Sequence, residues 1–220
     1  RLNLRQDVQW SDGEPFNADD VIYTFESIQN PEVGSPLLAA FQDITVERTG
    51  DYSISFTLKE PFAPFLNSLT VGILPEHVWS NIPPNSIKLA KTNLQPIGSG
   101  PWKFSKLTKK DASGSIQSYI LERNTYYYQE IPFLKTLTFE FYGDFSQIAS
   151  ALKSQEVKGI SFVPQDLAEK IAGKNFQLHQ FKLPQYTALF FNENTSPFLK
   201  NIDSRLALSL ALDKNKIVLD

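Results

Sequence analysis

The sequence predicts an α+β protein with more than one domain. Short runs that alternate polar and apolar residues recur along the 220 residues, and segments with helical spacing of apolar residues lie between them. Hydrophobic residues make up 41% of the chain and aromatic residues 13%, which is enough to build a sizeable core. The Gly- and Pro-rich segment 95–101 is the strongest break in composition, so we place a domain boundary near residue 93.

The first part of the chain predicts a strand, a helix and a hairpin. Alternation over residues 2–5 indicates the strand. The helix is expected to begin after Asn17, a residue type favoured at the N-cap, and to end at Asn30-Pro31. Alternating residues on both sides of Thr49-Gly50-Asp51 predict a hairpin, with strands at 44–47 and 52–58.

The remaining elements are shorter and are separated by turn residues. Apolar periodicity distinguishes expected strands from expected helices. The predicted strands are 102–104, 119–122, 137–141, 159–163 and 187–191, and the predicted helices are 36–41, 145–153, 165–172 and 202–212.

Composition excludes several classes of function. A formal net charge of -3 without a Lys/Arg run gives no electrostatic footprint for nucleic acid. There is no cysteine and only two histidines, His77 and His179, which are far apart in the sequence, so we expect no metal site. Each histidine is interpreted as a structural or surface residue.

Motifs for catalysis and cofactor binding are weak. Gly159-Ile160-Ser161 lacks the second glycine of a nucleophile elbow. Gly98-Ser99-Gly100 lacks the third glycine of a dinucleotide loop, since Lys103 occupies its position, and is interpreted as a turn or hinge. The carboxylate pairs Asp19/Asp20 and Glu140/Asp144 are interpreted as a solvated helix start and a strand edge.

A series of motifs resembles the family 5 solute-binding proteins, which include oligopeptide-, dipeptide- and nickel-binding proteins. The most specific run is WSDGEPFNADDVIYTF at residues 10–25. Further similarities follow in the family's order: FTLKEPFAPFL, GILPEHVW, PIGSGPWKF, LERNTYYY, ALFFNENTSPF and DSRLALSLALDKNKI. The resemblance covers nearly the whole chain.

The resemblance implies a periplasmic-binding-protein-like fold of type II, with two lobes, a hinge, and mixed sheets flanked by helices. Residues 1–92 would form the accessory domain of the peptide-binding class, and residues 93–188 the central part of the first lobe. Residues 189–220 would form the crossing strand and first helices of an otherwise missing second lobe. We therefore expect the chain, which contains no methionine, to be a piece of a longer protein.

The resemblance also implies a function. The chain would belong to the solute-binding component of an ABC importer, capturing peptides or a related small solute by lobe closure, and would be neither an enzyme nor a cofactor binder. Its partners would be the ligand and permease subunits, its location extracytoplasmic, and its only membrane attachment a lipid anchor absent from this chain. The residues expected to face the ligand are Ser35, Pro36, Phe41, Phe190 and Asn192.

Several alternatives stay open at this stage. The ligand could be a peptide, a nickel chelate, a sugar or an antibiotic. A scaffold or receptor without a transport role is one other reading, and a glycosidase-type enzyme with convergent carboxylates is another. The C-terminal helix carries Leu206, Leu210 and Ile217, so we expect an exposed apolar patch or self-association through it.

Overall fold

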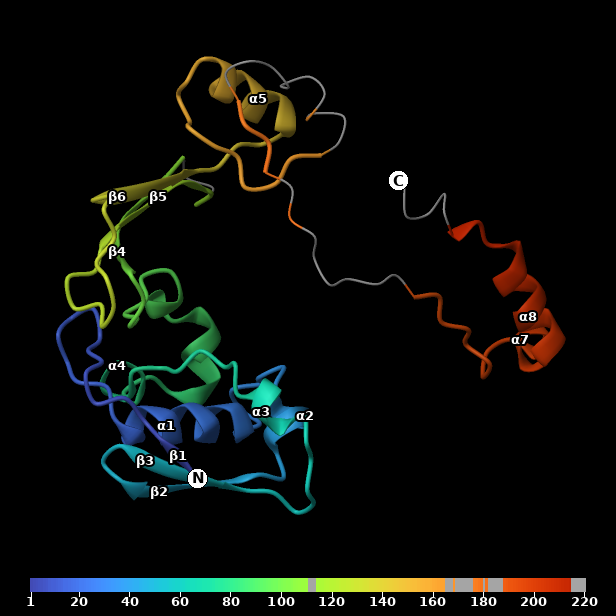
Figure 1. The fold of residues 1–220 in the computed structure, drawn as a ribbon, viewed down its shortest axis with the longest axis horizontal. Helices are drawn as coiled ribbons and strands as arrows, with labels where there is room; N and C mark the ends of the chain where they lie inside the picture. The colour runs from blue at the N-terminus through green and yellow to red at the C-terminus, as the bar shows by residue number, and fades with distance from the viewer. Residues whose placement is uncertain (111–113, 165–167, 169–175, 180, 182–187, 215–220) are drawn as a thin grey trace. The chain divides into compact units, whose positions relative to one another are not determined.

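The computed structural model describes residues 1–110, 114–164, 168, 176–179, 181 and 188–214 (Figure 1). The chain divides into two compact units, Arg1–Val163 and Pro164–Asp220. Among the described residues, none of the helices has the length and apolar character needed to span a membrane.

The first sheet of the first unit is antiparallel and has the order β1-β3-β2. Strand β1 (Leu2–Asn3) pairs with β3 (Ser53–Thr57), which forms the predicted hairpin with β2 (Thr45–Gly50). The register places Val46 opposite Phe56 and is interrupted by an irregularity between Arg48 and Gly50. The predicted strand and hairpin are therefore confirmed.

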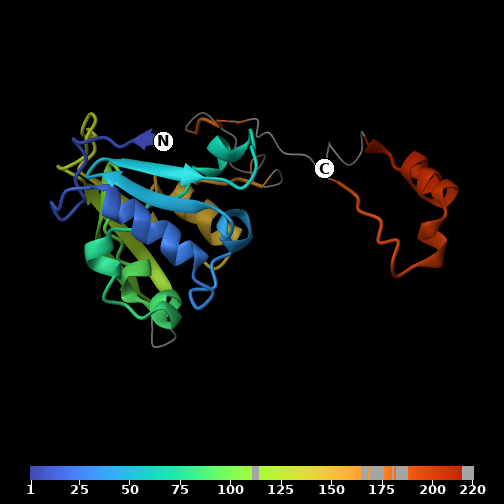
Figure 2. The same ribbon diagram turned by 90° about the horizontal axis from the view of Figure 1, so that it is seen from below.

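Helix α1 (Ala18–Gln29) packs against β2 and provides one side of the core (Figure 2). The Asn17 side chain accepts a hydrogen bond from the backbone N–H of Asp19, which confirms the predicted N-cap. The last helical residue is Gln29, and Asn30, directly before the proline, is the C-cap with an extended backbone. The buried cluster consists of Ala18, Val21, Phe25, Ile28, Phe41 and Ile54.

Short helical turns follow wherever prolines prevent longer elements. They are α2 (Leu38–Phe41), α3 (Phe65–Ser68), α4 (Glu76–Trp79) and the 3₁₀ turns η1 (Pro84–Leu89) and η2 (Lys91–Asn93). Three of these elements directly follow or begin with a proline, whose missing N–H is tolerated only in the first turn of a helix.

The second sheet is an antiparallel meander of β4 (Trp102–Lys109), β5 (Ile116–Arg123) and β6 (Thr136–Glu140). Each strand pairs with its neighbour in sequence in antiparallel orientation. Helix α5 (Phe145–Lys153) has the predicted bounds, and the Asp144 carboxylate caps it by accepting hydrogen bonds from two backbone N–H groups.

In the second unit, the structure confirms the predicted C-terminal helix. The short helix α7 (Pro197–Lys200) leads into α8 (Ile202–Ala211), which is capped by the Asn201 side chain. Leu206 and Leu210 on α8 are 57% and 77% exposed, and Ile217, the third residue of the predicted apolar patch, lies outside the described residues.

Two predicted strands are wrong in the residues that the structure describes. Residues 159–163 and, of the predicted strand 187–191, residues 188–191 form no strand. A strand requires a hydrogen-bonded neighbour, and within the described ranges neither segment pairs with one. The predicted helix 165–172 lies outside the described residues except at position 168, and Thr187, at the start of the second predicted strand, lies outside them as well.

Candidate functional site

The WSDG segment of the signature forms a tight turn. The backbone N–H of Trp10 donates to the carbonyl of Glu14 at 2.8 Å, and that of Gly13 donates to the carbonyl of Trp10 at 2.9 Å. Gly13 has φ +98°, a backbone conformation that side chains with a Cβ rarely adopt, and the Tyr126 ring lies against it. The motif therefore needs glycine at this position for a structural reason.

Asp20 holds three segments of the first unit together from a buried position. Its Oδ2 accepts hydrogen bonds from the backbone N–H of Asn17 at 2.9 Å and from the Trp10 indole at 3.3 Å. Its Oδ1 accepts one from the backbone N–H of Glu76, at the start of α4, at 2.8 Å. The side chain is 3% exposed, so the prediction of a solvated helix start is wrong for Asp20.

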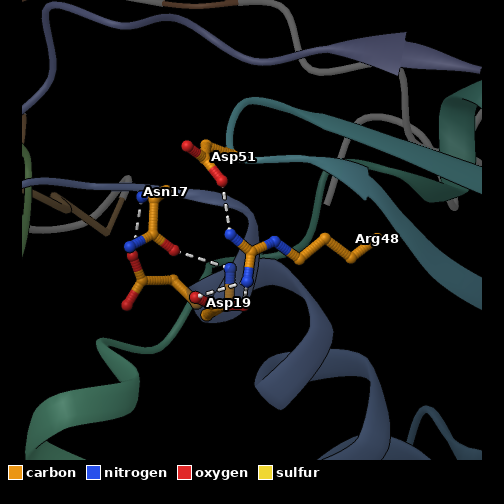
Figure 3. A network of polar contacts seen from close by, with 5 residues as sticks. Asn17, Asp19, Arg48 and Asp51 are labelled. Atoms are coloured by element: carbon orange, nitrogen blue, oxygen red, sulfur yellow. Dashed lines mark hydrogen bonds and ion pairs between the residues drawn. The ribbon is translucent and has the colours of Figure 1, made fainter.

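Asp19, the neighbour of Asp20, lies instead at the surface. Its carboxylate accepts a hydrogen bond from the Arg48 guanidinium at 3.0 Å, and the same guanidinium pairs with Asp51 (Figure 3). The backbone N–H of Ala18 also donates to the Asp51 carbonyl at 2.9 Å. These contacts fasten the beginning of α1 to the hairpin.

The Gly98–Gly100 loop is a junction between the signature turn and the second sheet. The backbone N–H of Ser11 donates to the Gly98 carbonyl at 2.9 Å. The fully buried Asn124 side chain donates to the Gly100 carbonyl at 2.9 Å and accepts from the backbone N–H of Tyr126 at 3.0 Å. The loop therefore connects the signature turn to the second sheet through hydrogen bonds, which agrees with its interpretation as a turn.

The loop between α1 and α2 carries two of the predicted ligand-facing residues, Ser35 and Pro36. The Ser35 hydroxyl accepts a hydrogen bond from the backbone N–H of Leu37 at 3.2 Å, and its carbonyl accepts one from Leu38 at 3.2 Å. Pro36 is exposed and Ser35 is partly exposed. Both residues are therefore accessible in a loop whose conformation is set by its own hydrogen bonds.

Phe41 has a different environment from Ser35 and Pro36. It is 1% exposed, and its ring packs edge-on against Phe25 with centroids 5.1 Å apart. Its neighbours within the first unit are core residues. The Phe41 side chain is thus part of the core cluster in this structure, and its predicted contact with a ligand stays a prediction.

Phe190 and Asn192 belong to the second unit. The Phe190 ring is 86% exposed. The Asn192 side chain accepts a hydrogen bond from the backbone N–H of Asn194 at 3.1 Å and so sets the turn before α7. The structure does not bring these two residues together with Ser35 and Pro36 in one unit.

His77 and Asp144 both have ordinary structural partners. His77 lies 2.9 Å from the Asp12 carboxylate, and His179 is exposed. The pKa of Asp144 lies below its usual range because the carboxylate accepts hydrogen bonds, first from the Ser146 hydroxyl and then from the backbone N–H of Gln147. In the part of the chain that the structure describes, no three His, Asp or Glu side chains gather as metal ligands would.

The structural roles of Asp20 and Asn124 were missed by the sequence analysis. The sequence did offer a signal for Asp20, because its spacing of four and eight residues from Thr24 and Ile28 places all three on one face of the helix. The structure shows that these three residues are buried. Asn124 offered no comparable periodicity, since it follows a strand in a turn-rich segment.

Comparison with known proteins supports the resemblance of the motifs. The oligopeptide-binding protein AppA of Bacillus subtilis is 27% identical over 221 residues, which cover 99% of this chain and 39% of that protein. The structure of AppA in complex with a nonapeptide aligns with a TM-score of 0.63 over 70% of this chain and 30% of that one, at 27% identity.

A second solved structure is similar over more of the chain. The crystal structure of NikZ from Campylobacter jejuni, in complex with Ni(L-His), aligns with a TM-score of 0.79 and 32% identity over 98% of this chain and 42% of that one. The chain thus spans about two fifths of the length of these relatives. The α+β, periplasmic-binding-protein-like fold predicted from the motifs is confirmed by these structures.

The family match extends over almost every residue. Residues 1–219 match the middle part of the bacterial extracellular solute-binding proteins, family 5. The WSDG turn, buried Asp20 and the Asn124 junction account physically for signature positions along this match. The chain therefore belongs to the bacterial extracellular solute-binding proteins of family 5.

Proposed function

We propose that this chain is part of the solute-binding component of an ABC importer, which captures a peptide or a related small solute. The observation that carries the proposal is the family match over residues 1–219. The relatives support it by their names: one is an oligopeptide-binding protein and another is the nickel-binding periplasmic protein of Escherichia coli, 26% identical over 229 residues. The proposed location is extracytoplasmic, with ABC permease subunits as partners and a lipid anchor as the membrane attachment.

The proposed mechanism is capture by closure of two lobes around the solute. A ligand shifts an equilibrium between open and closed states only by its difference in affinity for the two states. Contacts made in the closed state alone must therefore provide that difference. In this proposal residues 1–92 form the accessory domain, residues 93–188 form part of the first lobe, and residues 189–220 lead into the second lobe.

The proposed ligand-facing residues are Ser35 and Pro36 in the first unit and Phe190 and Asn192 in the second. The exposure of Phe190 supports its selection as a ligand-facing residue, because an exposed aromatic ring can pack on a solute without loss of any core contact. Phe41, which lies in the core cluster, stays a predicted ligand contact.

Catalysis is not part of the proposal. The glycosidase alternative needs two carboxylates that converge on a substrate. Asp19 is paired with Arg48, Asp20 is buried among three N–H donors, and Asp144 caps a helix. Each of these carboxylates therefore already has a structural role, which favours a binding protein.

A thermal-shift screen of the natural gene product that carries this sequence tests the proposal. The probes are peptide pools, nickel–L-histidine and oligosaccharides, because a ligand that binds only the folded state raises its stability, by about 2.7 kcal/mol at a hundred times the dissociation constant. We expect a shift with peptides or with the chelate. Phe190→Ala should weaken that shift, whereas Phe133→Ala, at a 91% exposed position that was not predicted to face ligand, should leave it unchanged.

The exposed leucines of α8 lead to a separate proposal for the isolated 220-residue chain. Leu206 and Leu210 leave apolar surface in contact with water, which favours association. We propose that the isolated chain self-associates through α8. Sedimentation analysis of the wild type and of Leu210→Glu tests this, and a wild type that stays monomeric at high concentration would contradict it.

A further inference from the structure

A lysine side chain lies against the loop that carries Ser35. Gly34 has φ +61°, and a Cβ built on it would lie 2.7 Å from Nζ and 3.5 Å from Cε of Lys88. Apart from Gly34 and its two neighbours in the chain, no other atom of the described residues lies within 4 Å of that position. The Lys88 ammonium, carried by η1, thus occupies the space that a side chain at position 34 would fill, one residue before Ser35.

The loop uses its own backbone donors internally. The N–H of Gly34 donates to the Pro31 carbonyl at 3.1 Å, and that of Leu37 donates to the Ser35 hydroxyl at 3.2 Å. Pro36 has no N–H. A solute acceptor that reaches this loop would therefore find few free backbone donors.

Lys88 provides hydrogen-bond donors beside this loop that are not used internally. Its side chain is exposed, and across the residues that the structure describes its ammonium forms no hydrogen bond or ion pair. An ammonium offers three N–H donors, and its strongest partners are carboxylates and other anions. The Lys88 ammonium beside this loop is thus available to an anionic group of a solute.

We propose that Lys88 binds a carboxylate of the captured solute beside Ser35 and Pro36. The inference rests on the proposed function and adds the chemical class of one ligand group. The carboxylate could belong to the C-terminus of a peptide or to an amino acid that chelates a metal ion. Both offer the same group to the ammonium, so two arms of the experiment separate them.

The test uses the natural gene product and measures the ligand concentration that gives half of the maximal thermal shift. One arm compares nonapeptides that have a free C-terminal carboxylate with the same peptides carrying a C-terminal amide. The other arm compares nickel–L-histidine with nickel and L-histidine methyl ester, which lacks the carboxylate. The variants are Lys88→Met, which removes the charge but keeps an unbranched side chain only one heavy atom shorter, and Lys91→Met, a matched change at an exposed lysine of η2.

We expect the wild type and Lys91→Met to prefer the free carboxylate about ten-fold in the arm that binds, the effect of one charge-assisted hydrogen bond. Lys88→Met should lose that preference, with the amide or ester form binding as it does to the wild type. Circular dichroism of each variant confirms that it is folded.

Two results would overturn the inference while the proposed function stands: a carboxylate preference that survives in Lys88→Met, or a wild type that binds both forms equally. A wild type that responds to neither peptides nor chelates would instead refute the proposed function, and the inference with it. A preference in the peptide arm identifies the peptide terminus as the source, and one in the chelate arm identifies the chelating amino acid.

Discussion

Replacing Asp20 should destabilise the first unit far more than replacing its neighbour Asp19. Asp20→Ala removes the acceptor of three N–H groups, on Asn17, Trp10 and Glu76, and leaves them in a buried site. Leaving one buried donor unsatisfied costs about 1–3 kcal/mol. Water can reach some of the three donors and lowers their combined cost, so we expect a loss of about 4 kcal/mol in the free energy of unfolding.

Asp20→Asn refines the same prediction. An amide keeps one carbonyl oxygen but presents an NH₂ group where the second carboxylate oxygen was, facing an N–H donor. We expect a loss of about 2 kcal/mol, half that of the alanine variant. The matched control, Asp19→Ala, breaks an ion pair whose carboxylate is 47% exposed, and such surface pairs contribute about 0–1 kcal/mol.

Urea denaturation followed by tryptophan fluorescence measures these differences. Trp10 and Trp79 are both buried in the first unit, and Trp10 donates directly to Asp20, so their emission reports on the affected region. The reasoning would be refuted if Asp20→Ala and Asp19→Ala shifted the urea midpoint equally, with unchanged slopes.

Three further changes test other parts of the structure. Asn124→Ala should lower the free energy of unfolding by about 3 kcal/mol, because it removes two buried hydrogen bonds, and an unchanged urea midpoint would count against the junction role. Phe41→Ala should cost about 3–5 kcal/mol as a core truncation, whereas weaker ligand binding without a loss of stability would show that the ring faces the solute. Asp144→Asn should speed hydrogen exchange at the start of α5 at neutral pH. The folded-state pKa of Asp144 is depressed below 3.8, so its stabilising effect is present above that pH and disappears as the pH falls through the folded-state pKa. The exchange rates of variant and wild type should therefore converge in strong acid, and a difference that persists there would contradict the role of the carboxylate charge.

Elements set by local chemistry could be predicted from the sequence. The N-cap Asn17 and the Asn30-Pro31 stop define α1 within the chain itself, and the amphipathic spacing of 145–153 defines α5. The hairpin around Thr49-Gly50-Asp51 is equally local, because its turn joins the two strands that pair.

Features that depend on distant partners could not be predicted. Residues 159–163 and 188–191 have the composition of strands, but strand formation depends on a neighbour that no local pattern specifies. Asp20 was interpreted with Asp19 as a solvated pair because its acceptor role depends on Glu76, which lies 56 residues away. Ser35 and Phe41 are only six positions apart in the sequence. Their different exposure comes from tertiary packing, because the Phe41 ring packs against Phe25 whereas Ser35 lies in a partly exposed loop.

The most direct test of solute capture is to ask whether the protein retains a solute and returns it unchanged. The natural gene product is incubated with a peptide pool and with nickel–L-histidine, separated from free solute, denatured, and the released solute is analysed by mass spectrometry. Our account predicts about one solute molecule retained per protein molecule and released with its covalent structure intact. Recovery of cleaved products, or no retention of either class of solute, would contradict it.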